Sequence, residues 1–262
     1  MIEIQQIAAA IYMAAGIGAL LGVALPAPRL SRGATWGLAL GAATQALAIA
    51  TMHRLDPVPA LTSLPVAVSL MVWTSIVSLL ILMWRVRLDG LAAVIGPVAF
   101  AAVFVCSLHM TGEPPTEEKT GSMPHAHVLL SSAGLGLLGV AGLAGLFFLL
   151  EHRRIKSKKV VARSASLPSL EALDRANVAS LAIGFPLLTL GVVTGAVWVN
   201  QMHGEWISGG QHEAWSLVAW VIYAGLATAR FAGRQGARQA AASAVAGFAF
   251  LLFAVVGVGI LT

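Results

Sequence analysis

Residues 167–223 read LPSLEALDRANVASLAIGFPLLTLGVVTGAVWVNQMHGEWISGGQHEAWSLVAWVIY. Two apolar segments, each long enough to cross a bilayer, flank a short polar insert at residues 200–213. The insert and its edges contain His203, Glu205, Trp206, His212 and Glu213, together with Trp198 and Trp215. Apolar walls beside a mouth rich in histidine and tryptophan favour a planar, apolar, metal-bearing ligand, and haem is the leading candidate.

The composition places the chain in a membrane. It is 58% hydrophobic and only 10% charged, whereas soluble domains carry about 25% charged residues. One span requires roughly 20 apolar residues, and we find such stretches at residues 4–25, 34–52, 64–84, 91–110, 127–150, 178–199, 214–231 and 240–261. We therefore predict an all-α integral membrane protein with about eight transmembrane helices. Residues 1–262 are expected to form a single polytopic membrane domain.

The cysteine content and the first residues narrow the class further. The single cysteine, Cys106, excludes an internal disulfide and a CxxCH motif, so the chain is not itself a c-type cytochrome. The sequence begins MIEIQQIAAA, with Glu3 and no basic residue before the first apolar run. A cleavable signal peptide has a basic region there, so we expect the first segment to be a true span.

The basic residues indicate the topology. Fourteen of the sixteen lie in or beside the connections that follow spans one, three, five and seven, and only Arg54 and Lys119 lie on the opposite side. Because cytoplasmic loops are enriched in lysine and arginine, both termini are expected to be extracytoplasmic, in a multi-pass protein of the bacterial cytoplasmic (inner) membrane. The positive charge is then a signal of topology and of contact with the lipid bilayer, and no nucleic acid is expected as a partner.

The histidines follow the opposite pattern. Six of the seven lie on the predicted outer side, namely His53, His109, His125, His127, His203 and His212. Haem b is held by neutral imidazoles whose second nitrogen is hydrogen-bonded. We rank His127 and His212 first as iron ligands, then His53, then His109. The alternative for each is an interfacial histidine that contacts lipid headgroups or a loop carbonyl. His203, expected in a loop, is either solvated or a mobile ligand.

Other polar and aromatic residues leave two interpretations open. Trp198, Trp206 and Trp215 either stack on a macrocycle or belong to an interfacial belt, whereas Trp220 and Tyr223 lie deeper and are expected to pack. Glu213 either orients an imidazole or is a helix-start acid stabilised by the helix dipole. Hydrolase and phosphate-binding motifs are absent from the sequence, and we name no catalytic residue.

Three segments resemble the cytochrome c assembly family of membrane proteins, which includes the CcsA, CcmC and HemX/YpjD-like branches. They are HVLLS from His127, the run LPSLEALDRANVASLAIGFPLLTLGVVTGAVW that ends at Trp198, and HEAWSLVAWVIY from His212. The resemblance is best over residues 124–262. It implies a helical bundle that handles haem at the outer face, with His127 as the family ligand that carries over.

The chain departs from the family pattern at the haem-presenting loop. Where the family's synthetase members have a WGxxWxWD loop, this chain reads HGEWISGGQHEAW, so that Trp206 is kept and ISGG replaces the core. His212 stands at the place of a lysine, and Thr228 at that of a later span histidine. These departures make the HemX/YpjD-like branch the expected nearer neighbour.

The sequence therefore predicts a membrane protein that binds haem b and presents it at the extracytoplasmic face for maturation of c-type cytochromes. Its expected partners are haem, apocytochrome c and other cytochrome c maturation membrane proteins. It is expected to be part of a haem-attachment system and not an independent enzyme. Two alternatives are a HemX-like regulatory or scaffolding protein of haem biosynthesis and a haem-bearing membrane subunit of an electron-transfer complex.

Overall fold

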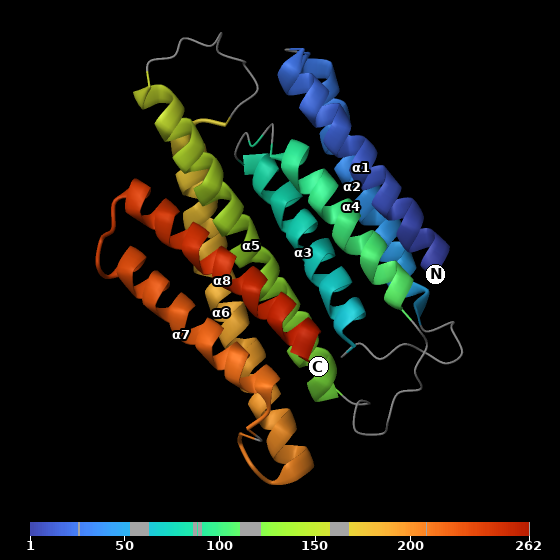
Figure 1. Ribbon diagram of the computed structural model, residues 1–262, viewed down its shortest axis with the longest axis vertical. Helices are drawn as coiled ribbons and strands as arrows, with labels where there is room; N and C mark the ends of the chain where they lie inside the picture. The colour runs from blue at the N-terminus through green and yellow to red at the C-terminus, as the bar shows by residue number, and fades with distance from the viewer. Residues whose placement is uncertain are drawn as a thin grey trace. The chain divides into compact units, whose positions relative to one another are not determined.

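The computed structural model describes residues 1–25, 27–52, 63–85, 88, 91–110, 122–157, 168–207 and 209–261, with only the backbone for residues 28, 85, 212 and 255–261. These described residues form eight α-helices and no strand. The helices are α1 (Ile2–Ala24), α2 (Pro28–Ala50), α3 (Leu64–Arg85), α4 (Ala92–His109), α5 (Ser122–Lys156), α6 (Leu170–His203), α7 (Gln211–Phe231) and α8 (Ala237–Leu261) (Figure 1). The all-α prediction is confirmed.

The chain divides into two compact units. The first contains Met1–Pro115 with Ser157–Ala172, and the second contains Thr116–Lys156 with Leu173–Thr262. Helices α1 to α4 thus belong to the first unit. Helices α5, α7 and α8 and nearly all of α6 belong to the second.

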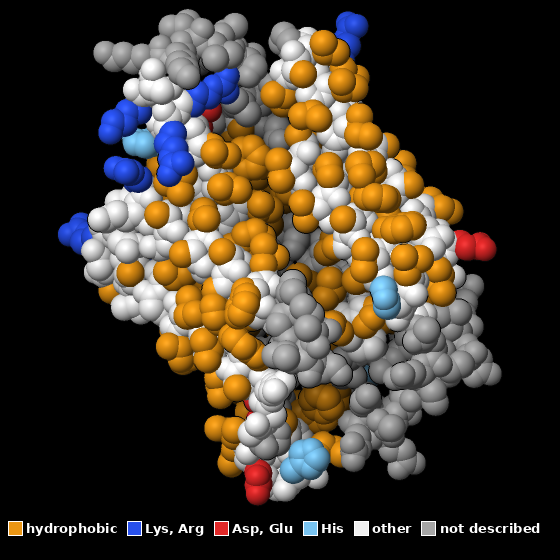
Figure 2. All heavy atoms as spheres, viewed as in Figure 1, with side chains coloured by type: hydrophobic (Ala, Val, Ile, Leu, Met, Phe, Trp, Pro, Cys, Tyr) orange, Lys and Arg blue, Asp and Glu red, His pale blue; other side chains and the backbone are white. Residues whose placement is uncertain are grey.

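Within the described ranges, every helix except α2 is long and apolar enough to cross a membrane, which makes seven candidate spans. Large apolar side chains such as Leu40, Ile81 and Ile183 are exposed, and hydrophobic side chains cover much of the visible surface (Figure 2). Water would disfavour such a surface, whereas lipid accepts it. The chain is a multi-pass membrane protein.

Helix α2 is less apolar because arginine, glycine, threonine and glutamine interrupt its sequence. It nevertheless runs antiparallel along α1. A Cβ on Gly22 of α1 would lie 2.6 Å from the Ser31 hydroxyl of α2, and a Cβ on Gly37 of α2 would lie 2.9 Å from that of Ala15. Glycine at such positions lets two backbones approach closely. Helix α2 therefore packs along α1.

A buried polar network joins α1, α2 and α3 inside the first unit. The Tyr12 hydroxyl donates to Gln45 Oε1 at 2.8 Å, and Gln45 Nε2 donates to the carbonyl and the hydroxyl of Ser69, each at 3.0 Å. Gln5 Nε2 donates to the same hydroxyl at 3.2 Å. Because every member has a partner, the network fixes the three helices at low energetic cost.

The second unit is built around α5, whose glycines face two neighbours. A Cβ on Gly134 would lie 2.6 Å from the Leu188 nitrogen of α6, and one on Gly145 would lie 2.7 Å from the Ala241 carbonyl of α8. Helix α7 joins α6 where Trp220 Nε1 donates to the Thr189 hydroxyl at 3.0 Å. An apolar core of Leu138, Leu181, Leu188, Tyr223 and Leu251 fills the space between these helices.

Helices α5 and α6 extend beyond the predicted apolar segments at both ends. His125, expected in a polar loop, lies in the first turn of α5, and His203, also expected in a loop, is the last residue of α6. The predicted boundaries were wrong here because hydropathy marks the lipid-soluble part of a helix. Good helix formers such as glutamate, lysine and arginine continue the backbone into water.

Candidate functional site

His127 lies on the face of α5 that packs against α6. Its Nδ1 is 2.8 Å from the backbone carbonyl oxygen of Gly191. Because a carbonyl oxygen only accepts, Nδ1 carries the proton and donates it. When the ring is neutral, its lone pair is then on Nε2. A histidine that ligates a metal has the same arrangement, with one ring N–H held by a backbone carbonyl or carboxylate.

Two glycines four residues apart on α6 make room for this contact. A Cβ on Gly195 would lie 2.8 Å from His127 Nδ1 and 3.0 Å from Cε1, and a Cβ on Gly191 would collide with Ser131 Oγ. Ser131 is one turn after His127 on α5, and its hydroxyl is 3.5 Å from the same Nδ1. The GVVTG segment therefore positions the imidazole against the α6 backbone.

Trp198 lies one turn beyond Gly195, next to the imidazole. The ring centroids of Trp198 and His127 are 6.3 Å apart, with the planes tilted by 40°. Its Nε1–H is buried and has no hydrogen-bond acceptor among the residues that the structure describes. Buried indole N–H groups usually have a partner, so this donor is a natural contact for a ligand with an oxygen acceptor.

The two histidines of the insert, His203 and His212, lie at the same end of the second unit as His127, where α5 begins, α6 ends and α7 begins (Figure 1). His203 is exposed, and His212 is the second residue of α7, with a side chain outside the described set. The loop between α6 and α7 turns at Gly204 and Gly209, whose φ angles of +74° and +76° favour glycine.

Glu213 interacts with this loop. One of its carboxylate oxygens accepts a hydrogen bond from the Gly209 backbone N–H at 3.2 Å. A carboxylate in the first turn of a helix is also stabilised by the helix dipole. This contact is consistent with the helix-start interpretation of Glu213.

The first unit contains the candidate ligands His53 and His109. His53 lies outside the described residues. His109 is exposed, and its Nδ1 is 2.9 Å from the carbonyl of Val105 in its own helix. Cys106 is instead buried in an apolar cluster with Met52, Val66 and Met110. Among the described residues, no group of three or more His, Cys, Asp or Glu side chains is close enough to hold a metal ion.

The remaining tryptophans have different environments. Trp206 is 63% exposed in the α6–α7 loop. Trp215 contacts the rings of Phe250 and Phe253 on α8, with centroids 6.0 and 5.8 Å away. Trp220 packs on Phe185, and Tyr223 is buried in the core, which confirms that these last two are packing residues.

Charge separates the two ends of this unit. Arg153, Arg154 and Lys156 end α5, Arg230 ends α7, and Arg234 and Arg238 lie near the start of α8. In Figure 2 most of the visible Lys and Arg side chains gather at the upper left, with a histidine beside them, and a histidine and an acidic side chain lie at the bottom. The histidine-rich end is thus the end opposite the basic one.

Comparison with known proteins identifies the family. A model described as "Cytochrome C assembly protein" matches residues 61–262. The chain belongs to the cytochrome c assembly family. The match covers α3 to α8 and therefore includes His127, Gly191 and Trp198.

Individual members of the family show the same relationship. The cytochrome c biogenesis protein CcsA of a Prochlorococcus marinus strain is 38% identical over 98 residues, which are 37% of this chain and 31% of the relative. CcsA of a Synechocystis strain is 31% identical over 125 residues, or 48% and 37% of the two chains. The matches thus span about a third of the length of these relatives. They give no support to the nearer HemX-like placement, and the two alternative functions are not favoured.

Sequence reasoning ranked His127 first together with His212 but missed Gly191, Gly195 and Ser131. The pair of glycines four residues apart in GVVTG was the available signal, since such spacing marks a close helix contact. Nothing in the sequence indicates that the contact would be with the imidazole of His127.

Proposed function

We propose that this protein binds haem b near the extracytoplasmic face of the bacterial cytoplasmic membrane and handles it for the maturation of c-type cytochromes. The observation that carries the proposal is the 2.8 Å hydrogen bond from His127 Nδ1 to the Gly191 carbonyl. It puts the imidazole in the tautomer that an iron ligand needs, inside the segment that the family match covers.

The residues present fit a haem in two respects. His127 is only half-buried, and with Nδ1 donating to the Gly191 carbonyl its neutral ring has the lone pair on Nε2. Trp198 has a buried N–H donor beside it, suited to a carboxylate oxygen such as that of a propionate. Bound haem would supply an iron centre with redox and Lewis-acid chemistry.

A second ligand is needed for six-coordinate iron. His212 is the leading choice because α7 begins at the end of the unit where His127 lies. His53 and His109 belong to the first unit and stay predictions from the sequence. Trp206 and Trp215 are further contacts in this proposal, Trp206 because it is exposed in the loop of the same end.

We infer the partners from the names of the relatives and from the positions at which this chain departs from the family pattern. The relatives are named cytochrome c biogenesis proteins, and we extend this role to the present chain, with apocytochrome c and other maturation proteins as its partners. Because ISGG replaces the tryptophan-rich core of the loop, we propose that this chain holds or delivers haem and that thioether formation requires another component.

The test is the visible spectrum of the full chain, purified in mild detergent from haem-replete cells, with and without dithionite. We expect a Soret band and sharp reduced α and β bands. The His127→Ala variant should lose most of its haem, whereas His152→Ala should retain it, because His152 lies at the basic end of the same helix and stacks on Phe148. An unchanged haem content in His127→Ala would remove the assignment.

A further inference from the structure

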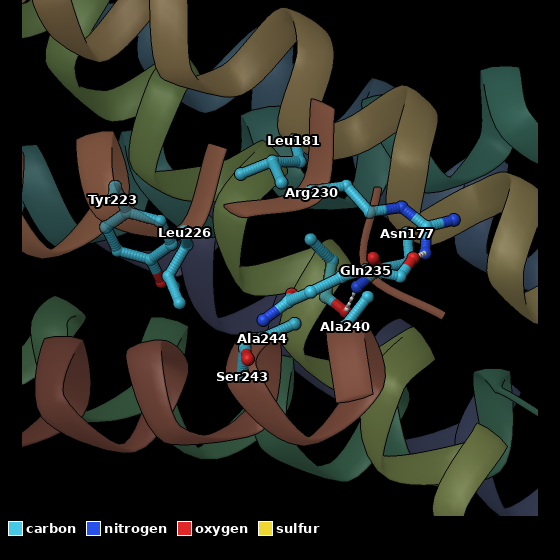
Figure 3. Close-up of a pocket in the computed structure, with 10 residues that line it drawn as sticks. Asn177, Leu181, Tyr223, Leu226, Arg230, Gln235, Ala240, Ser243 and Ala244 are labelled. Carbon is cyan, nitrogen blue, oxygen red and sulfur yellow. Dashed lines mark hydrogen bonds between the residues drawn. The ribbon is translucent and has the colours of Figure 1, made fainter. Parts of the chain in front are cut away.

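A small cavity lies among α5 to α8, at the basic end of the second unit (Figure 3). Polar side chains that line it include Asn177, Tyr223, Arg230, Gln235 and Ser243. The space open to the centre of a water molecule is about 10 Å³. This is about the smallest volume that holds one water.

Two buried polar atoms at this cavity lack a partner among the described residues, namely the Tyr223 hydroxyl and Gln235 Oε1. The Tyr223 side chain is only 1% exposed. In Figure 3 the Gln235 side chain extends across the cavity toward the side where Tyr223 lies, with Ser243 of α8 beside it. Since a buried polar atom without a hydrogen bond is costly, each of these groups requires a partner, and both line the same cavity.

We propose that this cavity is a binding site for one internal water molecule, which bridges the Tyr223 hydroxyl and the Gln235 carboxamide. The water donates to Gln235 Oε1 and accepts from the Tyr223 hydroxyl, with the Ser243 hydroxyl as a third partner. An internal water makes about three hydrogen bonds, which these three groups supply.

The charges around the cavity favour water over an ion. The Arg230 guanidinium lines it and disfavours a cation. Asp174 already pairs with Arg230, with Nη2 at 2.8 and 2.9 Å from the two carboxylate oxygens, and Arg230 Nη1 donates to the Gln235 carbonyl at 3.0 Å. Asn177 Nδ2 is likewise used, by the Ala141 carbonyl at 2.9 Å. A neutral ligand that both donates and accepts completes the set.

The water site would join two helices and the turn between them. Tyr223 is on α7, Gln235 is in the turn before α8, and Ser243 is on α8. The Tyr223 ring fits against Gly247 of α8, where a Cβ would lie 3.3 Å from Cζ. The Arg230–Asp174 pair ties the same region to α6. The bridging water therefore holds α7 and α8 together at the basic end.

The direction in which one substitution changes the melting temperature tests the proposal. If a water bridges the two groups, Tyr223→Phe should lower the melting temperature of the purified full chain by about 2–4 °C, because the water and Gln235 lose a partner. If the hydroxyl is buried without any partner, removing it should leave the melting temperature unchanged or raise it. Ser180→Ala is the matched control, since the Ser180 hydroxyl is buried without a partner among the described residues and does not line the cavity.

Two further measurements complete the test. Gln235→Met should also lower the melting temperature, and the double variant should lose less than the sum of the single losses, because both groups hold one water. A density map that resolves internal waters should show a peak within about 3 Å of Tyr223 Oη and Gln235 Oε1. No peak in such a map, or a direct hydrogen bond between the two side chains, would overturn the proposal, as would an unchanged melting temperature for Tyr223→Phe.

Discussion

The two units differ in how their buried polar groups are paired. In the first, Tyr12, Gln45, Ser69 and Gln5 satisfy one another across three helices, and among the described residues the Ser31 hydroxyl is the buried side-chain atom without a partner. In the second, Asn177 donates to the Ala141 carbonyl, but the buried polar atoms of Trp198, Ser180, Tyr223 and Gln235 have no partner among the described residues. A satisfied network stabilises a fixed arrangement, whereas an unsatisfied donor or acceptor marks a place for a ligand or a water. The second unit therefore has more positions at which a ligand or a water would complete a hydrogen bond.

The largest expected effect is on the first unit. Gln45→Leu should lower the free energy of unfolding by about 2–4 kcal/mol, because it removes hydrogen bonds to Tyr12 and Ser69 and leaves their polar atoms buried. Thermal unfolding of the purified protein measures this. Thr44→Val is the control, because the Thr44 hydroxyl bonds only its own helix, at Leu40. Equal melting temperatures for the two variants would remove the contrast between the units.

The second effect concerns the imidazole in the second unit. Gly195→Ala places a Cβ 2.8 Å from His127 Nδ1, so the ring must move away from the Gly191 carbonyl. We expect haem affinity to fall by about tenfold, on the scale of one charge-assisted or well-placed hydrogen bond. Gly225→Ala is the control, since a Cβ there has no neighbour within 4 Å in the described structure. Haem titration followed at the Soret band measures both, and equal affinities would argue against the site.

The third effect separates a binding donor from a structural one. Trp198→Phe should leave the stability of the haem-free protein unchanged or slightly higher, because its N–H has no acceptor in the described structure. It should weaken haem binding by about three- to tenfold. Trp220→Phe should do the reverse, because it loses the bond to Thr189, worth about 1 kcal/mol of stability. Identical behaviour of the two variants in melting and titration experiments would contradict the distinction.

The smallest effect tests the basic end. Asp174→Asn should lower the free energy of unfolding by about 1 kcal/mol, since its partner Arg230 is only 13% exposed and contacts it at 2.8 Å. Glu151→Gln should cost less than about 0.5 kcal/mol, because its 3.8 Å pair with Arg154 is looser and more exposed. Urea or thermal unfolding at low and high salt checks both, and a larger loss for Glu151→Gln would reverse the ranking.

Much of the fold could be predicted from the sequence, because lipid demands long apolar helices and hydropathy reports them directly. The helix ends could not be, since α5 and α6 continue into charged sequence where hydropathy has no information. That all 262 residues form a single membrane domain stays a prediction. The outward orientation of the termini also stays a prediction.

The site was predicted in part. His127 and His212 were ranked first from their positions on the predicted outer side, and that ranking stays a prediction; the structure adds the contact of His127 with α6. Its partners could not be predicted, because a backbone carbonyl such as that of Gly191 gives no signal in a sequence. The roles of Trp215 and Trp206 were left open for a similar reason. An aromatic residue that packs on a neighbour has the same sequence pattern as one that packs on a ligand. The contact of Trp215 with Phe250 and Phe253 exists only in three dimensions.

The close pairing of α1 with α2 has a consequence for biosynthesis. Helix α2 carries Arg29, Arg32 and Gln45 and is less hydrophobic than its neighbours. Its transfer from the translocon into lipid is therefore the least favourable among the eight described helices. Helix α1 is synthesised before α2. Its Tyr12 hydrogen-bonds Gln45 of α2, its Gly22 leaves room for Ser31 of α2, and the two helices have the same length. The two segments are thus suited to enter the bilayer together as a helical hairpin, with α1 serving as the insertion partner of the helix that follows it on the ribosome.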